Sequence, residues 1–133
     1  MTNRRTFLAT AATLGAAAVV SAAPMKSATT PAPLVHHVFF WLKNPGSKAD
    51  LAQLLAGIGS LAAIETVRGI HVGVPASTEK RDVVDNSYSA SEILFFADTA
   101  GQKTYQDHPL HQQFVAECSH LWSKVVVYDA VPA

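Results

Sequence analysis

The sequence has a single cysteine, Cys118, among 133 residues. An intramolecular disulfide is therefore excluded, and so are zinc sites built from two or four cysteines. An excess of charge is also missing, because ten basic and ten acidic residues give a formal net charge of zero. Without a positive field, a nucleic-acid partner is not expected. Glycine-rich phosphate loops and G-x-S-x-G elbows are absent, so nucleotide binding and serine hydrolysis have no support.

Hydrophobic residues, in contrast, make up 49% of the chain and charged residues only 15%. This composition is typical of a compact domain with a real core and argues against disorder. The length allows one such domain and is too short for two. We therefore expect one α/β or α+β domain.

The first 23 residues have the pattern of a signal peptide. Arg4 and Arg5 precede Phe7 and Leu8, and the run 9–23 is rich in alanine. A charged start, an apolar middle and a small-residue end are typical of an export leader. The Arg-Arg-x-Phe-Leu core resembles the twin-arginine (Tat) motif, so we expect export by the Tat machinery, with the periplasm as the destination. An uncleaved anchor is the alternative, but the run is shorter than the roughly 20 residues of a span.

Cleavage after Ala22 fits the small-residue rule, and Ala23 and Ala28 are the other candidate sites. Proline, threonine and alanine then dominate up to Pro33 and predict a linker over residues 24–33. The folded domain is expected over residues 34–133.

The hydrophobic pattern predicts strands over 34–43, 67–75, 88–97 and 124–131, a helix over 47–64, and a second helix that starts at residue 98 or 99 and restarts at Pro109. Proline suits the first turn of a helix and not its interior. The order strand, helix, strand, strand, helix, strand is the ferredoxin-like split βαβ arrangement, an α+β fold. Residues 76–87 predict a polar loop that covers a pocket mouth.

The first strand is apolar on both faces. One face carries His37, Phe39 and Trp41, and the other carries Val38, Phe40 and Leu42. A strand of this kind is covered on both sides, and a small domain has helices for only one side of its sheet. We expect the first set to line a pocket and the second set to meet another copy of the chain, which predicts a homodimer.

The densest group of proton-transferring side chains lies at the helix restart, in Tyr105, Asp107, His108 and His111. His108 precedes Pro109, so we interpret it as a helix cap. Tyr105 and His111 flank the break and can face one pocket. A histidine can act as general base and a phenol as a donor to an oxyanion. The alternative is that Tyr105 is a core aromatic and His111 a surface residue.

Several of these features resemble the stress-responsive A/B barrel (Dabb) domain. They are the first strand with His37, the segments 95–98 and 125–129, and above all the Tyr-x-x-His-Pro-x-His pattern of residues 105–111. The resemblance covers nearly the whole chain after the linker and implies a ferredoxin-like fold that dimerises into an α+β barrel. Most members have no established reaction. In a plant member that closes a polyketide ring by aldol chemistry, the catalytic positions correspond to Tyr105, His111 and His37.

We therefore take Tyr105, His111 and His37 as candidate catalytic residues, and we expect the following side chains to line the pocket: Phe39, Trp41, Glu92 and Phe114. Glu92 departs from the resemblance, which implies an apolar residue there. A carboxyl group on an apolar strand face should have a raised pKa and can act as acid or base. If the opposite face is the buried one, Glu92 lies at a rim.

Three functions stay open. The first is an exported Dabb protein whose pocket takes a small apolar or aromatic carbonyl compound, with no cofactor. The second is a lyase, cyclase or isomerase with His111 as base and Tyr105 as oxyanion donor. The third is a cofactor-free monooxygenase or a haem-binding protein of the wider dimeric α+β barrel group. A metal site is not expected, since His108 and His111 are the one plausible pair of ligands by spacing.

Overall fold

The computed structural model describes residues 33–133. The predicted leader, and the linker up to residue 32, lie outside the described residues. Within residues 33–133, no helix is both long enough and apolar enough to cross a membrane.

The described chain forms four strands and three α-helices, with a short 3₁₀ turn after α1 and another after α3. In order they are β1 (Leu34–Leu42), α1 (Lys48–Ser60), η1 (Leu61–Ala63), β2 (Gly69–Gly73), β3 (Ala90–Phe96), α2 (Thr99–Asp107), α3 (Pro109–Cys118), η2 (Ser119–Leu121) and β4 (Trp122–Ala130). The strands make one antiparallel sheet in the order β2-β3-β1-β4. The predicted ferredoxin-like α+β fold is confirmed.

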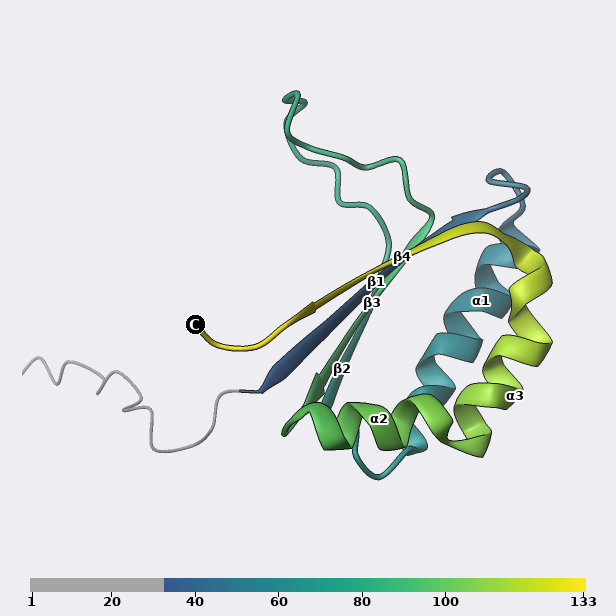
Figure 1. Ribbon diagram of the computed structural model, residues 1–133. Helices are drawn as coiled ribbons and strands as arrows, with labels where there is room; N and C mark the ends of the chain where they lie inside the picture. Colours follow the sequence, from purple (N-terminus) through teal and green to yellow (C-terminus); the bar gives the residue numbers. More distant parts are fainter. Residues whose placement is uncertain (1–32) are drawn as a thin grey trace, which may run out of the picture.

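All three helices lie on one side of the sheet, and its other side is open in the described part of the chain (Figure 1). Figure 1 also shows the long segment between β2 and β3 projecting away from the body. The first two helices begin where their sequences predict, although α1 ends at Ser60 and a 3₁₀ turn replaces the rest of the helix predicted up to residue 64. The Asp50 N–H donates to Ser47 Oγ at the start of α1, and the Gly101 N–H donates to Asp98 Oδ1 at the start of α2. Both contacts satisfy N–H groups that a helix start leaves unpaired.

The core lies between the helices and the even-numbered residues of β1. Val38, Phe40 and Leu42 are almost fully buried there, together with Leu54 and Ile58 of α1. The assignment of the two faces of β1 made from the sequence is therefore wrong. The face expected to meet a second copy is covered by the chain's own helices, and the face of His37, Phe39 and Trp41 is the open one.

Candidate functional site

A cavity of about 300 Å³ lies between the sheet and the helices α2 and α3. Its polar side chains are His36, Glu92, Tyr105, Gln106 and His111, and its apolar ones are Val38, Phe40, Phe114, Val115, Trp122, Val125 and Val127. This mixture of an apolar body and a few convergent polar groups is the usual character of a small-molecule site.

The break between α2 and α3 brings Tyr105 and His111 together. The Leu110 N–H donates to His108 Nδ1 over 3.1 Å, and Pro109 opens α3, so the predicted capping role of His108 is confirmed. His108 Nε2 also lies 3.3 Å from a carboxylate oxygen of Glu65. The rings of Tyr105 and His111 are consequently 4.8 Å apart, edge to face. Both side chains line the cavity, while His108 fixes the break.

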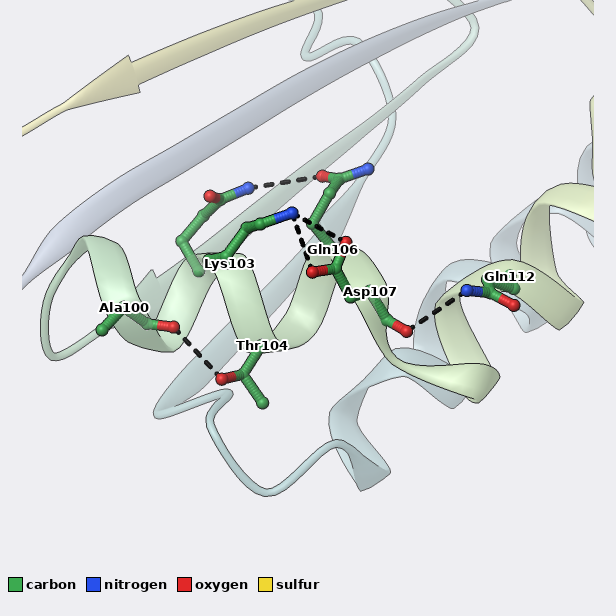
Figure 2. A network of polar contacts seen from close by, with 7 residues as sticks. Ala100, Lys103, Thr104, Gln106, Asp107 and Gln112 are labelled. Atoms are coloured by element: carbon green, nitrogen blue, oxygen red, sulfur yellow. Dashed lines mark hydrogen bonds and ion pairs between the residues drawn. The ribbon is translucent and has the colours of Figure 1, made fainter.

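Surface contacts hold the same break from the solvent side. Lys103 Nζ lies 2.8 Å from a carboxylate oxygen of Asp107, one turn along α2. The side-chain amide of Gln112, in α3, donates to the Asp107 carbonyl over 3.3 Å. Figure 2 shows this network on the exposed side of α2 and across the break. The Gln112 contact crosses the break, whereas the Lys103–Asp107 pair lies within α2.

Tyr105 is paired with a buried carboxyl group. Its hydroxyl donates to Glu92 Oε1 over 3.0 Å, and each residue is only 1% exposed. Burial raises the pKa of Glu92 from 4.5 to about 7, although the hydrogen bond from Tyr105 acts in the opposite direction. Burial, and then the nearby Glu92 carboxylate, also raises the pKa of Tyr105. Tyr105 is therefore a neutral hydrogen-bond donor, and Glu92 exchanges its proton near neutral pH.

A second histidine–carboxylate contact lies beside this pair. His36 on β1 is the register partner of Asp129 on β4, and its Nδ1 lies 2.5 Å from Asp129 Oδ1. An ionised carboxylate accepts the Nδ1–H, which fixes the tautomer and leaves Nε2 for another partner. The His36 ring is 5.6 Å from the Tyr105 ring. Asp129 thereby orients an imidazole at the cavity wall.

His111 lines the cavity as well. Burial lowers its pKa, and the neighbouring His36 lowers it further. The imidazole of His111 is therefore neutral at pH 7 and can accept a proton.

His37 does not join this cavity, so the shared pocket of His37, Tyr105 and His111 expected from the sequence is wrong. Successive side chains of a strand point to opposite faces, and His36 takes the place expected of His37. Since both faces of β1 are apolar, the sequence pattern alone did not decide between two adjacent histidines. His36 and Asp129 were missed for this reason, and because their contact joins residues 93 positions apart.

Phe39 and Trp41 also lie on the open face, away from Tyr105. With Asp85, Tyr88 and Tyr128 they line a smaller hollow of about 140 Å³. The loop 76–87, expected to cover the pocket mouth, contributes Asp85 to this hollow and no residue to the larger cavity. Of the four residues expected to line the pocket, Glu92 and Phe114 line the cavity that contains Tyr105, and Phe39 and Trp41 do not.

The described residues hold no group of three or more histidine, cysteine, aspartate or glutamate side chains arranged for a metal ion. The polar groups that meet in the cavity are instead suited to hydrogen bonding and proton transfer. The two histidines, the phenol and the carboxyl can each give or take a proton.

The fold and the cavity define a ferredoxin-like α+β domain with titratable groups on the helix-covered face of its sheet. Residues 34–132 match the Stress Responsive A/B Barrel Domain, and the chain belongs to this Dabb family. No protein with a curated description matches the chain.

Three solved structures illustrate the similarity. A Dabb family protein with a ferredoxin-like fold from Mesorhizobium loti is 27% identical, over 77% of this chain and 98% of that one, with a TM-score of 0.63. A hydroxynitrile lyase from Passiflora edulis is 21% identical, over 77% and 95%, with a TM-score of 0.65. A dimeric ferredoxin-like protein of unknown function from Thermobifida fusca is 17% identical, over 77% and 92%, with a TM-score of 0.61. The last two, at such low identity, show similarity of fold.

Proposed function

We propose that the cavity binds a small, largely apolar carbonyl compound and promotes proton transfer next to the carbonyl group. The observation that carries this proposal is the convergence of Tyr105, His36 and His111 on one apolar cavity of about 300 Å³. This volume lies at the lower end of the range of small-molecule sites, which suits a ligand of about one ring.

Each polar group has a role in such a reaction. The Tyr105 hydroxyl donates to the carbonyl oxygen, where negative charge develops as a neighbouring proton leaves. His36, oriented by Asp129, takes that proton, as a carboxylate-held imidazole does in serine hydrolases. His111, neutral at pH 7, hydrogen-bonds the ligand beside Tyr105. Lyase or isomerase chemistry is the class that these roles support.

A cyanohydrin is one adduct of a carbonyl compound that such a site can cleave. In that reaction His36 takes the proton of the hydroxyl group, the carbon–carbon bond to the nitrile breaks, and cyanide leaves with the electron pair as the aldehyde forms. The Passiflora edulis structure, a hydroxynitrile lyase, shows that a similar fold accommodates a lyase of this kind. Mandelonitrile is therefore a suitable first substrate, and benzaldehyde the product to follow.

The test uses binding first and turnover second. In a Trp41→Phe background, Trp122 is the remaining tryptophan and lines the cavity, so its fluorescence reports ligand entry. Benzaldehyde and acetophenone are expected to quench it. Val127→Phe, which narrows the cavity at a residue that is 47% exposed, should weaken that binding without disturbing the core. Failure of both compounds to bind would refute the proposal.

Turnover separates catalysis from binding. Tyr105→Phe should lower kcat/KM for mandelonitrile by about 10²–10³-fold, the usual effect of removing an oxyanion donor. The same variant should bind acetophenone within a few-fold of the original protein. If the pocket binds acetophenone and no aromatic cyanohydrin or ketone reacts, the site is a binding site and not a lyase.

We also propose that the open face of the sheet pairs with a second copy of the chain. Phe39, Trp41 and the largely exposed Tyr128 leave an apolar surface there. His37 Nε2 lies buried on this face with no hydrogen-bond partner among residues 33–133, a partner that a second copy can supply. The Thermobifida fusca structure is of a dimeric protein. Export by the Tat machinery, through residues 1–23, completes the proposal and makes the periplasm the place of action.

A further inference from the structure

Glu92 is the one carboxyl group on the helix-covered face of β3, between Ala90 and Leu94. It is 1% exposed, and among the described residues its hydrogen-bond partner is the Tyr105 hydroxyl. No lysine, arginine or histidine in residues 33–133 forms an ion pair with it. A carboxylate without a cation is costly at such a position, so the protonated acid is favoured.

The Tyr105–Glu92 contact can run in either direction. When Glu92 is ionised, the Tyr105 hydroxyl donates to it over 3.0 Å, and that hydrogen is withheld from any ligand. When Glu92 is protonated, its O–H can donate to Tyr105 Oη over the same distance, and the phenol hydrogen is free to turn to the cavity. The protonation of Glu92 therefore decides what Tyr105 offers to a ligand.

We propose that protonated Glu92 and Tyr105 together form an oxyanion site, selective for ligands with an enolate or phenolate oxygen. The inference rests on the proposed function and narrows its ligand class. A neutral acid and a phenol joined in an apolar cavity stabilise a negatively charged oxygen more than a neutral carbonyl, because each donor gains strength in low dielectric. A protonated carboxylic acid beside a tyrosine is known to serve enolate chemistry in this way.

Other titratable groups face Glu92, and each is a possible source of a pH dependence. Tyr105 comes from α2, His36 from β1 and His111 from α3, while Asp129 of β4 lies behind His36. The facing residue of β2 is Val72, which has no charge. Burial lowers the pKa of His111, so that residue loses its proton at lower pH than Glu92, whose pKa is about 7. Glu92 is therefore the group whose loss of a proton should weaken oxyanion binding above pH 7.

The test compares two probes of nearly the same shape, 4-nitrophenol and 4-nitroanisole. The phenol can bind as its coloured phenolate, and the anisole cannot ionise. In the original protein, bound 4-nitrophenol should show the phenolate absorption band below the pH at which the free probe ionises. Its affinity should fall about tenfold per pH unit well above pH 7, which corresponds to one proton taken up on binding. The affinity for 4-nitroanisole should stay flat over the same range.

Three variants test whether the proton taken up on binding belongs to Glu92. Glu92→Gln should remove the fall in affinity for 4-nitrophenol above pH 7, because an amide does not ionise in this range. Glu79→Gln, a change at an exposed carboxylate outside the cavity, should keep this decline. His36→Gln should also keep it, even if its affinity is lower.

The outcomes separate this inference from the proposed function. If neither probe binds, both fail. If 4-nitroanisole binds, the pocket stands. The oxyanion site is then refuted if the affinity for 4-nitrophenol does not fall above pH 7 in the original protein. It is also refuted if that fall persists in Glu92→Gln or disappears in His36→Gln. A bound 4-nitrophenol without the phenolate band would also refute it.

Discussion

Replacing Glu92 by glutamine should stabilise the protein at alkaline pH and leave its stability almost unchanged in acid. Burial raises the pKa of Glu92 in the folded protein from 4.5 to about 7. One pKa unit corresponds to ~1.4 kcal/mol, so the ionised carboxylate lowers the free energy of unfolding by roughly 3 kcal/mol. Glutamine has the same shape, and its amide can still accept from the Tyr105 hydroxyl.

The pH window follows from the sign of the shift. Below pH 4.5 the carboxyl is protonated in both the folded and the unfolded chain, and its ionisation costs nothing. Between pH 4.5 and about 7 the unfolded chain loses the proton while the folded protein keeps it, so stability falls as pH rises. Above pH 7 the full difference of roughly 3 kcal/mol between Glu92→Gln and the original protein is expected.

Urea unfolding followed by circular dichroism at pH 4.5, 6, 7 and 8 measures this difference directly. Glu79→Gln is the matched control, because the Glu79 side chain is 79% exposed and lies in the segment between β2 and β3. A constant difference between Glu92→Gln and the original protein at all four pH values would refute the reasoning. It would mean that water or a cation reaches Glu92 in the folded protein.

Three further predictions concern packing, assembly and export. A Cβ on Gly57 would lie 2.7 Å from Cys118 Sγ, so Gly57→Ala should lower the free energy of unfolding by about 1–3 kcal/mol. Gly59→Ala, with nothing within 4 Å, should instead raise it by up to ~1 kcal/mol, and equal thermal shifts of the two variants would contradict the packing argument. Light scattering should find a dimer at micromolar concentration and a monomer for Phe39→Glu, and a stable monomer of the original protein would contradict pairing through the open face. Changing Arg4 and Arg5 together to lysine should leave unprocessed protein in the cytoplasm after cell fractionation, and normal export of that variant would exclude the Tat route.

The sequence was sufficient for the fold because each element depends on local signals. The apolar alternation of β1, the capping serine before α1 and the proline that opens α3 are all visible within a few residues. The pairing of Tyr105 with His111 was predictable for the same reason, since both flank one helix break. These features need no knowledge of how distant segments meet.

The rest of the site depends on distant segments and could not be obtained in this way. Whether His36 or His37 faces the helices is a question of register, and a strand with two apolar faces leaves that question open. Asp129 reaches His36 only because β4 pairs with β1. Glu92 was visible as a charge on an apolar strand, but its hydrogen bond to Tyr105 requires α2 to lie over β3.

The cost of Glu92 and its proposed use depend on the same proton. A loss of roughly 3 kcal/mol is large against the 5–15 kcal/mol that stabilise a typical domain, so ionised Glu92 is a real burden on the fold. The stability cost is absent below pH 4.5 and grows up to about pH 7. The folded protein keeps the proton, and can turn the Tyr105 hydroxyl toward the cavity, up to about pH 7. Phenolate binding should therefore weaken only above the pH at which the stability cost is complete. Glu92→Leu should remove this pH-dependent loss in the free energy of unfolding. The same change would also remove the proton on which the proposed oxyanion site depends.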